Sequence, residues 1–312
     1  MSTLLIDRRN VSLDYEGQCL IVRHPELPTR SIPINRLQKV VCMHGVDLHT
    51  RVLGQCQSRG IDFITLNARH SDSSFAIHAS HQQQARRRLV QYELNAQPEH
   101  ALPIARRLVH LKLANGLRLL RRDADSLHID MLGQLLQRVR RSPDADSLRG
   151  LEGSAQRILF AHWRRLLPES LGFEQRRRRP PPDPVNALLS LTYTLVYHEA
   201  IRQCLVFGLD SWLGFYHRLA HGRHSLACDL MEPLRPRIEL WVVNLCREKL
   251  LDNRHFSNAS GQCLLGKAGR ELYYQQWYPM QQQWGRHLRR HAGVLARHLD
   301  SLPPQSPVEQ AA

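Results

Sequence analysis

One histidine and two acidic residues lie close together in the segment 208–236. His217 comes first, and Asp229 and Glu232 follow with a spacing of three. On a helix, that spacing places both carboxylates on the same face. A neutral imidazole and carboxylate oxygens can bind a divalent cation together, and an oxygen-rich site with few protein ligands leaves positions for water and phosphate. The segment therefore predicts a site for Mg²⁺ or Mn²⁺.

A third ligand for this site is Glu152, which lies in a segment of helical apolar periodicity. The residues alone leave other interpretations open. A glutamate at the head of a helix is usually a surface residue that offsets the positive helix end. Glu232 directly precedes a proline, which is typical of a residue that opens a helix. His221 and His224 compete with His217 for the role of ligand.

The charge balance indicates a polyanionic partner. The 312 residues include 43 lysines and arginines against 28 acidic residues, a formal net charge of +15. Only four of the basic residues are lysines, which leaves 39 arginines, and the guanidinium fork binds phosphate oxygens bidentately. A GC-rich genome explains the ratio of arginine to lysine but not the net excess. Nucleic acid is therefore the expected partner, ahead of an anionic membrane surface.

The arginines gather in seven short clusters, each of which by itself is more often a solvated helix face than a binding site. They lie at 86–88, 106–107, 121–122, 140–141, 164–165, 176–179 and 289–290. The cluster at 176–179 leads into three prolines, which is typical of a loop. We expect Arg176, Arg177, Arg178 and Arg179 to contact DNA phosphates, and their loop to become ordered only when DNA is present.

Composition excludes several protein classes. With 42% hydrophobic and 23% charged residues, the chain is typical of a globular protein and not of a disordered one. No apolar run reaches the roughly 18–20 residues that cross a bilayer, and Asp7 places a charge too early for a signal peptide. The seven cysteines are widely spread and form no CxxC pair, which disfavours a zinc ribbon or a disulfide framework. We expect a protein of the reducing cytoplasm.

The elements that must position these residues form two regions, and they predict an α+β fold class. A small N-terminal β-rich domain over residues 1–80 is followed by a larger, mainly α-helical catalytic domain over 81–300. In the first region, short apolar runs predict strands, and Tyr15–Gly17 predicts a hairpin turn. The strands are expected at 11–13, 19–22, 32–34, 40–42 and 63–66, with a helix over 48–58 that Asp47 caps.

Apolar residues recur at helical spacing throughout the second region. Prolines and glycines divide the pattern into segments. Helices are expected at 81–94, 101–122, 124–141, 147–166, 184–207, 232–251 and 271–298. The polar, proline-containing end of the chain, 301–312, is expected to be a disordered tail.

Four segments in order along the chain resemble the CRISPR-associated adaptation endonuclease/integrase family, and the resemblance covers most of the chain. They are LEGSAQRILF (151–160), RRRRPPPDPVNALLSLTYTLVYHEA (176–200), GLDSWLGFYH (208–217) and SLACDLMEPLRP (225–236). Ser211 stands where a proline is common in the family, and none of the departures removes a candidate ligand. The order of a β-rich region and a helical region also agrees with the two-domain architecture of that family.

This resemblance implies a metal-dependent DNA endonuclease and integrase. The metal ligands of the family correspond to Glu152, His217 and Glu232, and Asp229 matches a nearby acid that assists them. With Mg²⁺ or Mn²⁺ bound, the 3′-hydroxyl of a DNA fragment would attack a phosphodiester at the boundary of a CRISPR repeat. The DNA contacts expected from the matching segments are Asn186, Tyr197 and Arg235, together with the cluster Arg176–Arg179.

The resemblance also implies partners. A homodimer would form through the β-rich domains, and two such dimers would bridge a dimer of a small ferredoxin-like protein, the second CRISPR adaptation protein. The DNA partners would be the prespacer fragment, the CRISPR repeat and branched intermediates. Two other hypotheses stay open. A branched-DNA repair nuclease would use the same site on another substrate, and an architectural protein would bind DNA without metal and without chemistry.

Overall fold

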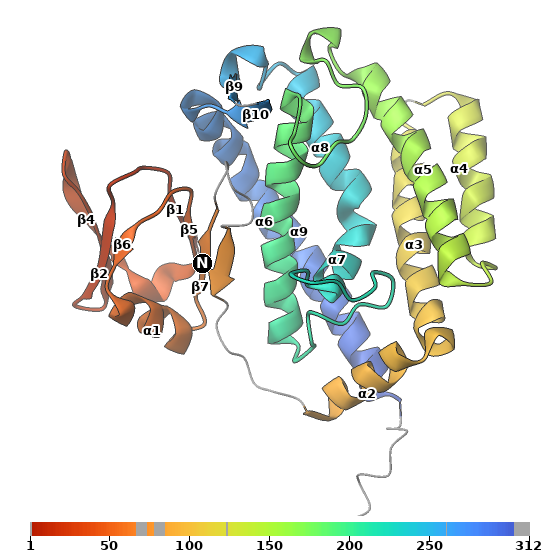
Figure 1. Cartoon of the computed structure of the whole chain (residues 1–312), viewed down its shortest axis with the longest axis horizontal. Helices are drawn as coiled ribbons and strands as arrows, with labels where there is room; N and C mark the ends of the chain where they lie inside the picture. Colours follow the sequence, from red (N-terminus) through yellow and green to blue (C-terminus); the bar gives the residue numbers. More distant parts are fainter. Residues whose placement is uncertain (1, 67–73, 78–84, 123, 260, 303–312) are drawn as a thin grey trace, which may run out of the picture. The chain divides into compact units, whose positions relative to one another are not determined.

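The computed structural model describes residues 2–66, 74–77, 85–122, 124–259 and 261–302. The chain forms two compact units, residues 1–83 and 84–312, and this division falls close to residue 80, where the sequence texture changes. Strands dominate the first unit and helices dominate the second (Figure 1). The fold is therefore α+β, with the two classes in the expected order along the chain.

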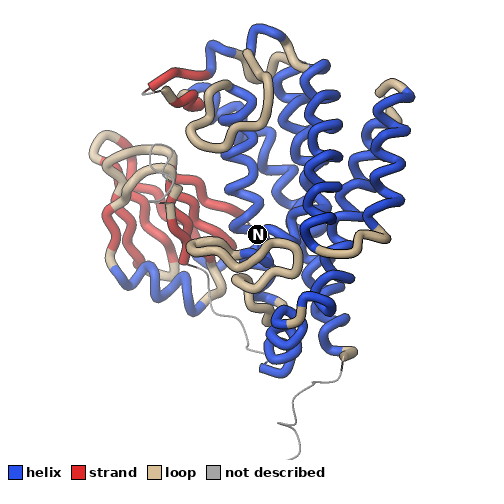
Figure 2. Tube along the Cα trace, turned by 45° about the vertical axis from the view of Figure 1, so that its right-hand side comes forward, coloured by secondary structure: helices blue, strands red, loops and turns tan. Residues whose placement is uncertain are grey.

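Two four-stranded sheets make up the N-terminal unit (Figure 2). The first has the strand order β1-β5-β7-β8, in which β8 is antiparallel and the other pairs are parallel. The second has the order β4-β3-β2-β6, in which only the β2–β6 pair is parallel. The bounds are β1 (Ser2–Ile6), β2 (Ser12–Glu16), β3 (Cys19–His24), β4 (Leu27–Pro33), β5 (Leu37–Cys42), β6 (Asp47–Leu48), β7 (Asp62–Thr65) and β8 (Phe75–Ile77).

The core of this unit forms between the sheets and the helix α1 (Thr50–Ser58). Leu20 and Val40 are fully buried in it, and α1 adds Val52 and Cys56. The turn of the β2–β3 hairpin falls at Gly17 and Gln18, which have positive φ angles of +53° and +64°, so it shares only Gly17 with the predicted turn, and Tyr15 and Glu16 belong to β2. Two consecutive residues of this kind match the twist of paired strands.

Each predicted strand of the first region overlaps an observed strand, but the prediction that Asp47 caps the helix is wrong. Asp47 and Leu48 form β6, which pairs with β2. His49 caps α1 instead, since its Nδ1 accepts a hydrogen bond from the Arg51 backbone N–H at 3.2 Å. The strands β1, β6 and β8 were not predicted, because they are short or lack a clear alternation of apolar and polar residues.

The second unit is a helical bundle with one small hairpin (Figure 1). Its helices are α2 (Ala85–Ala96), α3 (Pro98–Leu120), α4 (Ser126–Val139), α5 (Ala145–Leu166), α6 (Pro184–Val206), α7 (Ser225–Met231), α8 (Arg235–Arg247) and α9 (Lys267–Asp300). Short 3₁₀ turns are η3 (Glu169–Leu171), η4 (Glu232–Leu234) and η5 (Asn253–His255), and β9 (Phe256–Ala259) pairs with β10 (Gln262–Leu265).

Aspartate caps start three of the long helices. The side chains of Asp125, Asp144 and Asp183 accept hydrogen bonds from the backbone N–H of the third residue beyond them, at 3.0, 2.7 and 2.8 Å. Each cap satisfies a donor that the helix start leaves without an intrahelical partner. α3 then packs against α4, α5 and α8, and α6 packs against α7, α8 and α9.

The predicted helix over 232–251 is interrupted at its start. α7 ends at Met231, the residues Glu232–Leu234 form the turn η4, and α8 begins at Arg235. Pro233 and Pro236 cause the break, because neither has a backbone N–H to donate to the preceding turn. The tail from residue 303 and the helix start at 81–84 lie outside the described residues. Within the described parts of the chain, none of the helices combines the length and apolarity needed to cross a membrane.

Candidate metal and nucleic-acid site

Two glutamate side chains from different elements converge on one lysine in the helical unit. Lys112 lies on α3, Glu152 on α5 and Glu232 on η4. The Lys112 Nζ donates to Glu232 Oε2 at 2.8 Å and also to Glu152 Oε1. Lys112 and Glu232 are both 2% exposed, so these charges interact in a region with little solvent screening. The two carboxylates therefore lie within reach of a single cationic centre.

Arg235, the first residue of α8, provides a second positive charge for Glu232. Its Nε donates to Glu232 Oε1 at 2.5 Å. Burial raises the pKa of Glu232, but the charges of Arg235 and Lys112 outweigh burial and lower that pKa to about 2. Glu232 is therefore a carboxylate at neutral pH, as a metal ligand must be.

His217 reaches the same carboxylate from the loop that joins α6 to α7. Its Nε2 lies 3.6 Å from Glu232 Oε1, and its Nδ1 lies 2.7 Å from Asp229 Oδ1. Because a carboxylate only accepts hydrogen bonds, Nδ1 carries the ring proton and donates it to Asp229. In the neutral ring, Nε2 then keeps a lone pair, so Asp229 sets the tautomer that can bind a metal ion.

Asp229 also holds the backbone of this loop. It is fully buried on α7, and its carboxylate accepts three backbone hydrogen bonds from consecutive residues. The donors are the N–H groups of Phe215 at 2.5 Å, Tyr216 at 2.9 Å and His217 at 2.9 Å. One carboxylate thus fixes both the backbone and the side chain of His217. This contact explains why an acid stands three residues before Glu232.

Replacing Gly214 with alanine is expected to disrupt the loop. An added Cβ would lie 2.8 Å from Asp229 Oδ2 and 2.8 Å from the backbone carbonyl of Ser225, closer than real Cβ contacts. We expect a loss of about 1–3 kcal/mol in unfolding free energy, measured by urea denaturation. Gly133→Ala on α4 is the matched control, because its added Cβ would meet open space. Equal stability of the two variants would contradict the close approach at Gly214.

The donor set of this site fits a divalent cation, although the present geometry does not form a complete cage. Among the described residues, no three His, Cys, Asp or Glu side chains are arranged to hold a metal ion. The bridge through Lys112 nevertheless shows that oxygens of Glu152 and Glu232 can share one positive centre. Two carboxylates and one imidazole form a ligand set that Mg²⁺ or Mn²⁺ accepts. If such an ion bound, Glu152, His217 and Glu232 would be the residues to hold it.

The competing histidines have other contacts. His221 is exposed. His224 stacks on Trp212 with 3.8 Å between ring centroids, and its Nδ1 lies 2.7 Å from the Ser211 hydroxyl. The Tyr197 hydroxyl accepts the backbone N–H of His224 at 2.8 Å, and burial raises the pKa of Tyr197 to about 12. Of these three histidines, the described contacts bring only His217 to Glu232, and Tyr197 positions the same loop.

The arginine loop before α6 is anchored at its first member. Arg176 Nη1 donates to Asn186 Oδ1 at 2.8 Å, and Nη2 donates to Ser190 Oγ at 3.0 Å. Asn186 is fully buried and its side-chain amide donates to Asp183, so within the protein it serves the loop, and its predicted contact with DNA stays a prediction. These contacts tie Arg176 to the start of α6, and the expectation that the rest of the loop becomes ordered on DNA stays a prediction.

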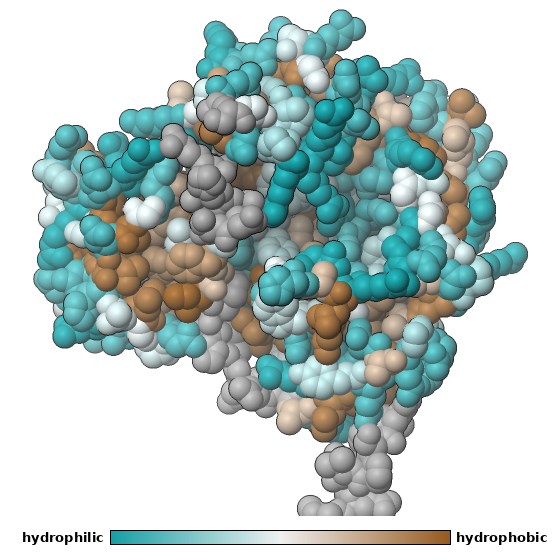
Figure 3. All heavy atoms as spheres, in the orientation of Figure 1, coloured by the Kyte–Doolittle hydropathy of each residue, from teal (hydrophilic) through white to brown (hydrophobic). Residues whose placement is uncertain are grey.

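Arg177, Arg178 and Arg179 are exposed on this loop, so their placement leaves the predicted phosphate contacts open. The backbone N–H of Arg177 donates to Asn186 Oδ1 at 2.9 Å, and this bond fixes the path of the loop. Hydrophilic side chains cover most of the face of the helical unit that Figure 3 presents.

Tyr193 links the arginine loop to the carboxylate site. Its ring lies 4.8 Å from the guanidinium of Arg235 and 5.7 Å from that of Arg176, both within the range of cation–π contacts. Its hydroxyl donates to Glu239 Oε1 at 2.7 Å, and Glu239 also accepts from Trp163 Nε1 at 3.2 Å. This buried network holds Arg235 against Glu232.

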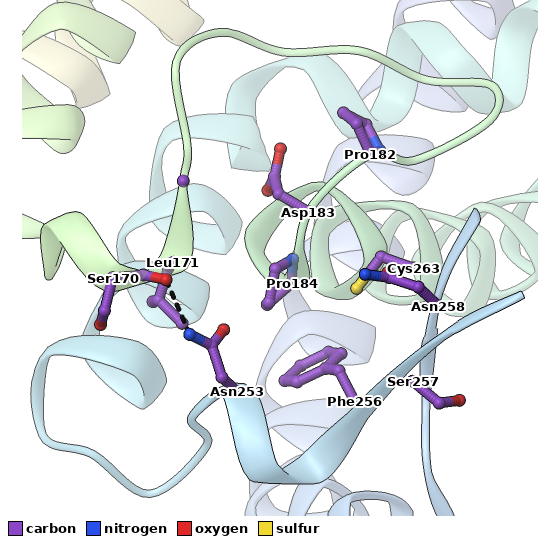
Figure 4. A pocket seen from close by; sticks show the side chains of 11 residues that line it. Ser170, Leu171, Pro182, Asp183, Pro184, Asn253, Phe256, Ser257, Asn258 and Cys263 are labelled. Carbon is purple, nitrogen blue, oxygen red and sulfur yellow. Dashed lines mark hydrogen bonds between the residues drawn. The ribbon is translucent and has the colours of Figure 1, made fainter. Parts of the chain in front are cut away.

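A cavity of about 350 Å³ lies elsewhere in the helical unit (Figure 4). Asp183 and Cys263 line it, together with Phe256 and neighbouring polar residues. The Asp183 carboxylate already caps α6 through Asn186, and burial raises the pKa of the Cys263 thiol to about 11. Neither Asp183 nor Cys263 is therefore an activated nucleophile in this cavity.

Sequence reasoning missed Lys112. Its signal is a single lysine on an otherwise apolar helix face: Val109 and Leu113 on either side of it are fully buried. Such a charge must find partners inside the protein. Asn115, one turn further on the same face, donates to the Pro233 carbonyl at 2.8 Å. α3 thus contributes two polar side chains that hold η4 in place.

Comparison with known sequences identifies relatives of this chain. The model of the CRISPR associated protein Cas1 family matches residues 4–278. The CRISPR-associated endonuclease Cas1 1 of Thermodesulfovibrio yellowstonii is 33% identical over 297 residues, which cover 91% of each chain. The similarity spans both units, so it includes the carboxylate site and the N-terminal sheets.

Solved structures share the fold over almost the whole chain. A CAS1 protein from Thermotoga maritima matches with a TM-score of 0.85 at 20% identity, covering 96% of this chain and 97% of the other. A casposase bound to integration product matches with a TM-score of 0.82 at 16% identity, covering 98% and 94%. A Cas6-RT-Cas1–Cas2 complex contains a chain that matches with a TM-score of 0.83 at 22% identity, covering 96% of this chain and 35% of that one.

Proposed function

The chain belongs to the CRISPR-associated Cas1 protein family, and from this premise we propose that it is a metal-dependent DNA endonuclease and integrase of CRISPR adaptation. The observation that carries the proposal is the convergence of Glu152 and Glu232 on one cationic centre, beside a histidine that Asp229 holds in the metal-binding tautomer. A net charge of +15 supports DNA as the substrate.

Glu152, His217 and Glu232 are the proposed ligands of Mg²⁺ or Mn²⁺. When bound, such an ion polarises the scissile phosphate and offsets the charge that develops in the transition state. Asp229 acts through His217, because it orients the ring and keeps the proton on Nδ1. Arg235 is fixed by Glu232 and Tyr193, and we assign its guanidinium a contact with the reacting phosphate.

The proposed reaction exchanges one phosphodiester for another. The 3′-hydroxyl of an incoming DNA fragment attacks a phosphorus atom at the boundary of a CRISPR repeat, its proton leaves to solvent, and the displaced strand departs with a 3′-hydroxyl. With water as nucleophile, the same site cleaves DNA. No enzyme nucleophile is needed, which agrees with the cysteines of the helical unit: burial raises the pKa of Cys204, Cys228, Cys246 and Cys263.

The proposed assembly is a homodimer through the N-terminal sheets that works with a small ferredoxin-like protein of the Cas2 type, in the cytoplasm where the chromosome lies. The similarity to a chain of a Cas6-RT-Cas1–Cas2 complex supports the partner, and the similarity to a casposase bound to integration product supports the joining reaction. The relative from Thermodesulfovibrio yellowstonii is named an endonuclease, so a branched-DNA nuclease is the second candidate. A panel of substrates separates the two, because only an integrase joins a fragment with free 3′-hydroxyls to an intact repeat.

Replacing Arg177 and Arg178 together with alanine is expected to weaken DNA binding uniformly across sequences. Both side chains are exposed, so their loss removes phosphate contacts without removing packing. When the logarithm of the association constant for DNA is plotted against the logarithm of the salt concentration, the slope should become less steep by about 1–2 units. Fluorescence anisotropy measures the association constant. The control variant replaces two other exposed arginines, Arg8 and Arg9 of the N-terminal unit, with alanine. An unchanged slope in the Arg177/Arg178 variant would mean that this loop is only a solvated segment.

A further inference from the structure

Lys112 is one of four lysines in a chain with 39 arginines, and its side chain is buried. Its Nζ donates to carboxylates on two separate elements, Glu232 at 2.8 Å and Glu152. Glu232 has Arg235 as its other cation. Two positive and two negative charges thus balance one another at the centre of the proposed metal site.

A divalent ion cannot simply be added to this arrangement. Its ligands would be the same two carboxylates that Lys112 already holds, and at short range like charges repel strongly in a weakly screened site. Lys112 must therefore release at least one carboxylate when a metal ion binds. The ammonium can do so because it is a compact charge on a flexible stem of four methylene groups, whereas an arginine would hold a carboxylate with a rigid fork.

We propose that Lys112 is a built-in counter-ion, which holds Glu152 and Glu232 together before metal binding and gives up one or both of them to the metal ion. Lys112 is thus a positioning residue with two effects. It stabilises the metal-free protein, because it neutralises two buried carboxylates. It also weakens metal binding, because the ion must displace it. The proposal rests on the metal-dependent function proposed for this site.

Lys112→Met tests both effects, because methionine keeps most of the length of the side chain and removes the charge. In the metal-free variant, the thermal midpoint should fall by roughly 5–10 °C, since two buried carboxylates lose a partner. The dissociation constant for Mn²⁺, measured by calorimetry on the full chain without DNA, should fall about tenfold or more. Saturating Mn²⁺ should raise the thermal midpoint of the variant again and reverse most of this fall. Lys112→Arg is the matched control, because it keeps the charge and should not tighten Mn²⁺ binding.

A folded Lys112→Met variant that binds Mn²⁺ no more tightly than the wild type overturns the proposal, since a purely structural lysine would not compete with the ion. If the wild type itself binds no Mn²⁺, the proposed metal-dependent function fails, and the counter-ion role fails with it. The two failures are distinguishable, because failure of the metal-dependent function shows as absent Mn²⁺ binding in the wild-type protein, whereas failure of the counter-ion role shows only in the Lys112→Met variant.

The wild-type protein offers a second measurement that does not depend on the variant folding. Labelling lysine with ¹³C at Cε gives four signals, from Lys39, Lys112, Lys249 and Lys267. Titration with diamagnetic Mg²⁺ should shift the signal of Lys112 and leave the other three in place, with Lys112→Arg used to assign it. A Lys112 signal that does not move at saturating Mg²⁺ overturns the proposal.

Discussion

Replacing Glu232 with glutamine is expected to abolish strand transfer while DNA affinity stays within about threefold of the wild type. The substitution keeps the shape of the side chain but removes a charge that faces Lys112, Arg235 and His217. Loss of a metal ligand removes several kcal/mol of transition-state stabilisation, so the rate of joining should fall by about 10³-fold or more. No phosphate-binding cation is lost, and DNA binding should therefore persist.

The measurement is a joining assay with a labelled DNA fragment, run beside a filter-binding assay on the same preparations. Glu248→Gln, an exposed acid at the end of α8, is the matched control and should keep wild-type activity. If Glu232→Gln joins DNA at more than about a tenth of the wild-type rate, Glu232 is not a ligand and the assignment of the site is wrong.

Replacing Asp229 with alanine should destabilise the helical unit more than a single substitution in the loop that joins α6 to α7, which Asp229 holds from α7. Three backbone N–H groups and the His217 ring lose their acceptor inside the protein. Each buried donor left unsatisfied costs about 1–3 kcal/mol, so we expect a total loss of about 3 kcal/mol or more. Urea denaturation monitored by tryptophan fluorescence measures it.

Asp229→Asn separates the stabilising role of this residue from its role in orienting His217. Asparagine keeps the shape, and with its oxygen in the place of Oδ2 it still accepts from the N–H groups of Phe215 and Tyr216. Its NH₂ group would then donate to Nδ1 of His217 and move the ring proton to Nε2, while the His217 backbone N–H loses its acceptor. Mn²⁺ affinity should then fall about 10–100-fold with a smaller loss of stability. Asp210→Ala, in the loop that joins α6 to α7, is the control, since Asp210 accepts from Trp212 and Tyr92 and not from the His217 ring. Unchanged Mn²⁺ affinity in Asp229→Asn would contradict the role of Asp229 in setting the tautomer.

Much of the fold could be predicted from local patterns. The helices over α3–α6 and α9 and the turn at Gly17 depend on periodicity and turn chemistry, which nearby residues determine. α7 was not predicted, and the predicted helix began at Glu232, three residues before α8, because Pro233 and Pro236 lack a backbone N–H and the turn η4 precedes the helix. β6 was missed because a strand of two residues shows no periodicity. It pairs with β2, whose residues are distant from it in the sequence.

In the candidate site too, some residues could be predicted from the sequence and others could not. Glu152, His217, Asp229 and Glu232 stand in segments whose residue types and order are distinctive, so the sequence alone could single them out. Lys112 could not be assigned, because its partners are 40 and 120 residues away in the chain. The same limit applies to Asn186, whose contacts with Arg177 and Asp183 inside the protein could not be read from the matching segment.

The central claim is that Glu152, His217 and Glu232 form a metal site that joins DNA strands, and a strand-transfer assay tests it most directly. Labelled DNA with free 3′-hydroxyls is mixed with a supercoiled plasmid carrying a CRISPR repeat array and with Mg²⁺, Mn²⁺ or a chelator, in the presence and absence of the Cas2-type partner. Wild-type protein should join label to the plasmid only when metal is present, and Glu152→Ala should join none. Cleavage of branched DNA without joining would favour the repair nuclease, and DNA binding without chemistry under any metal would contradict the account.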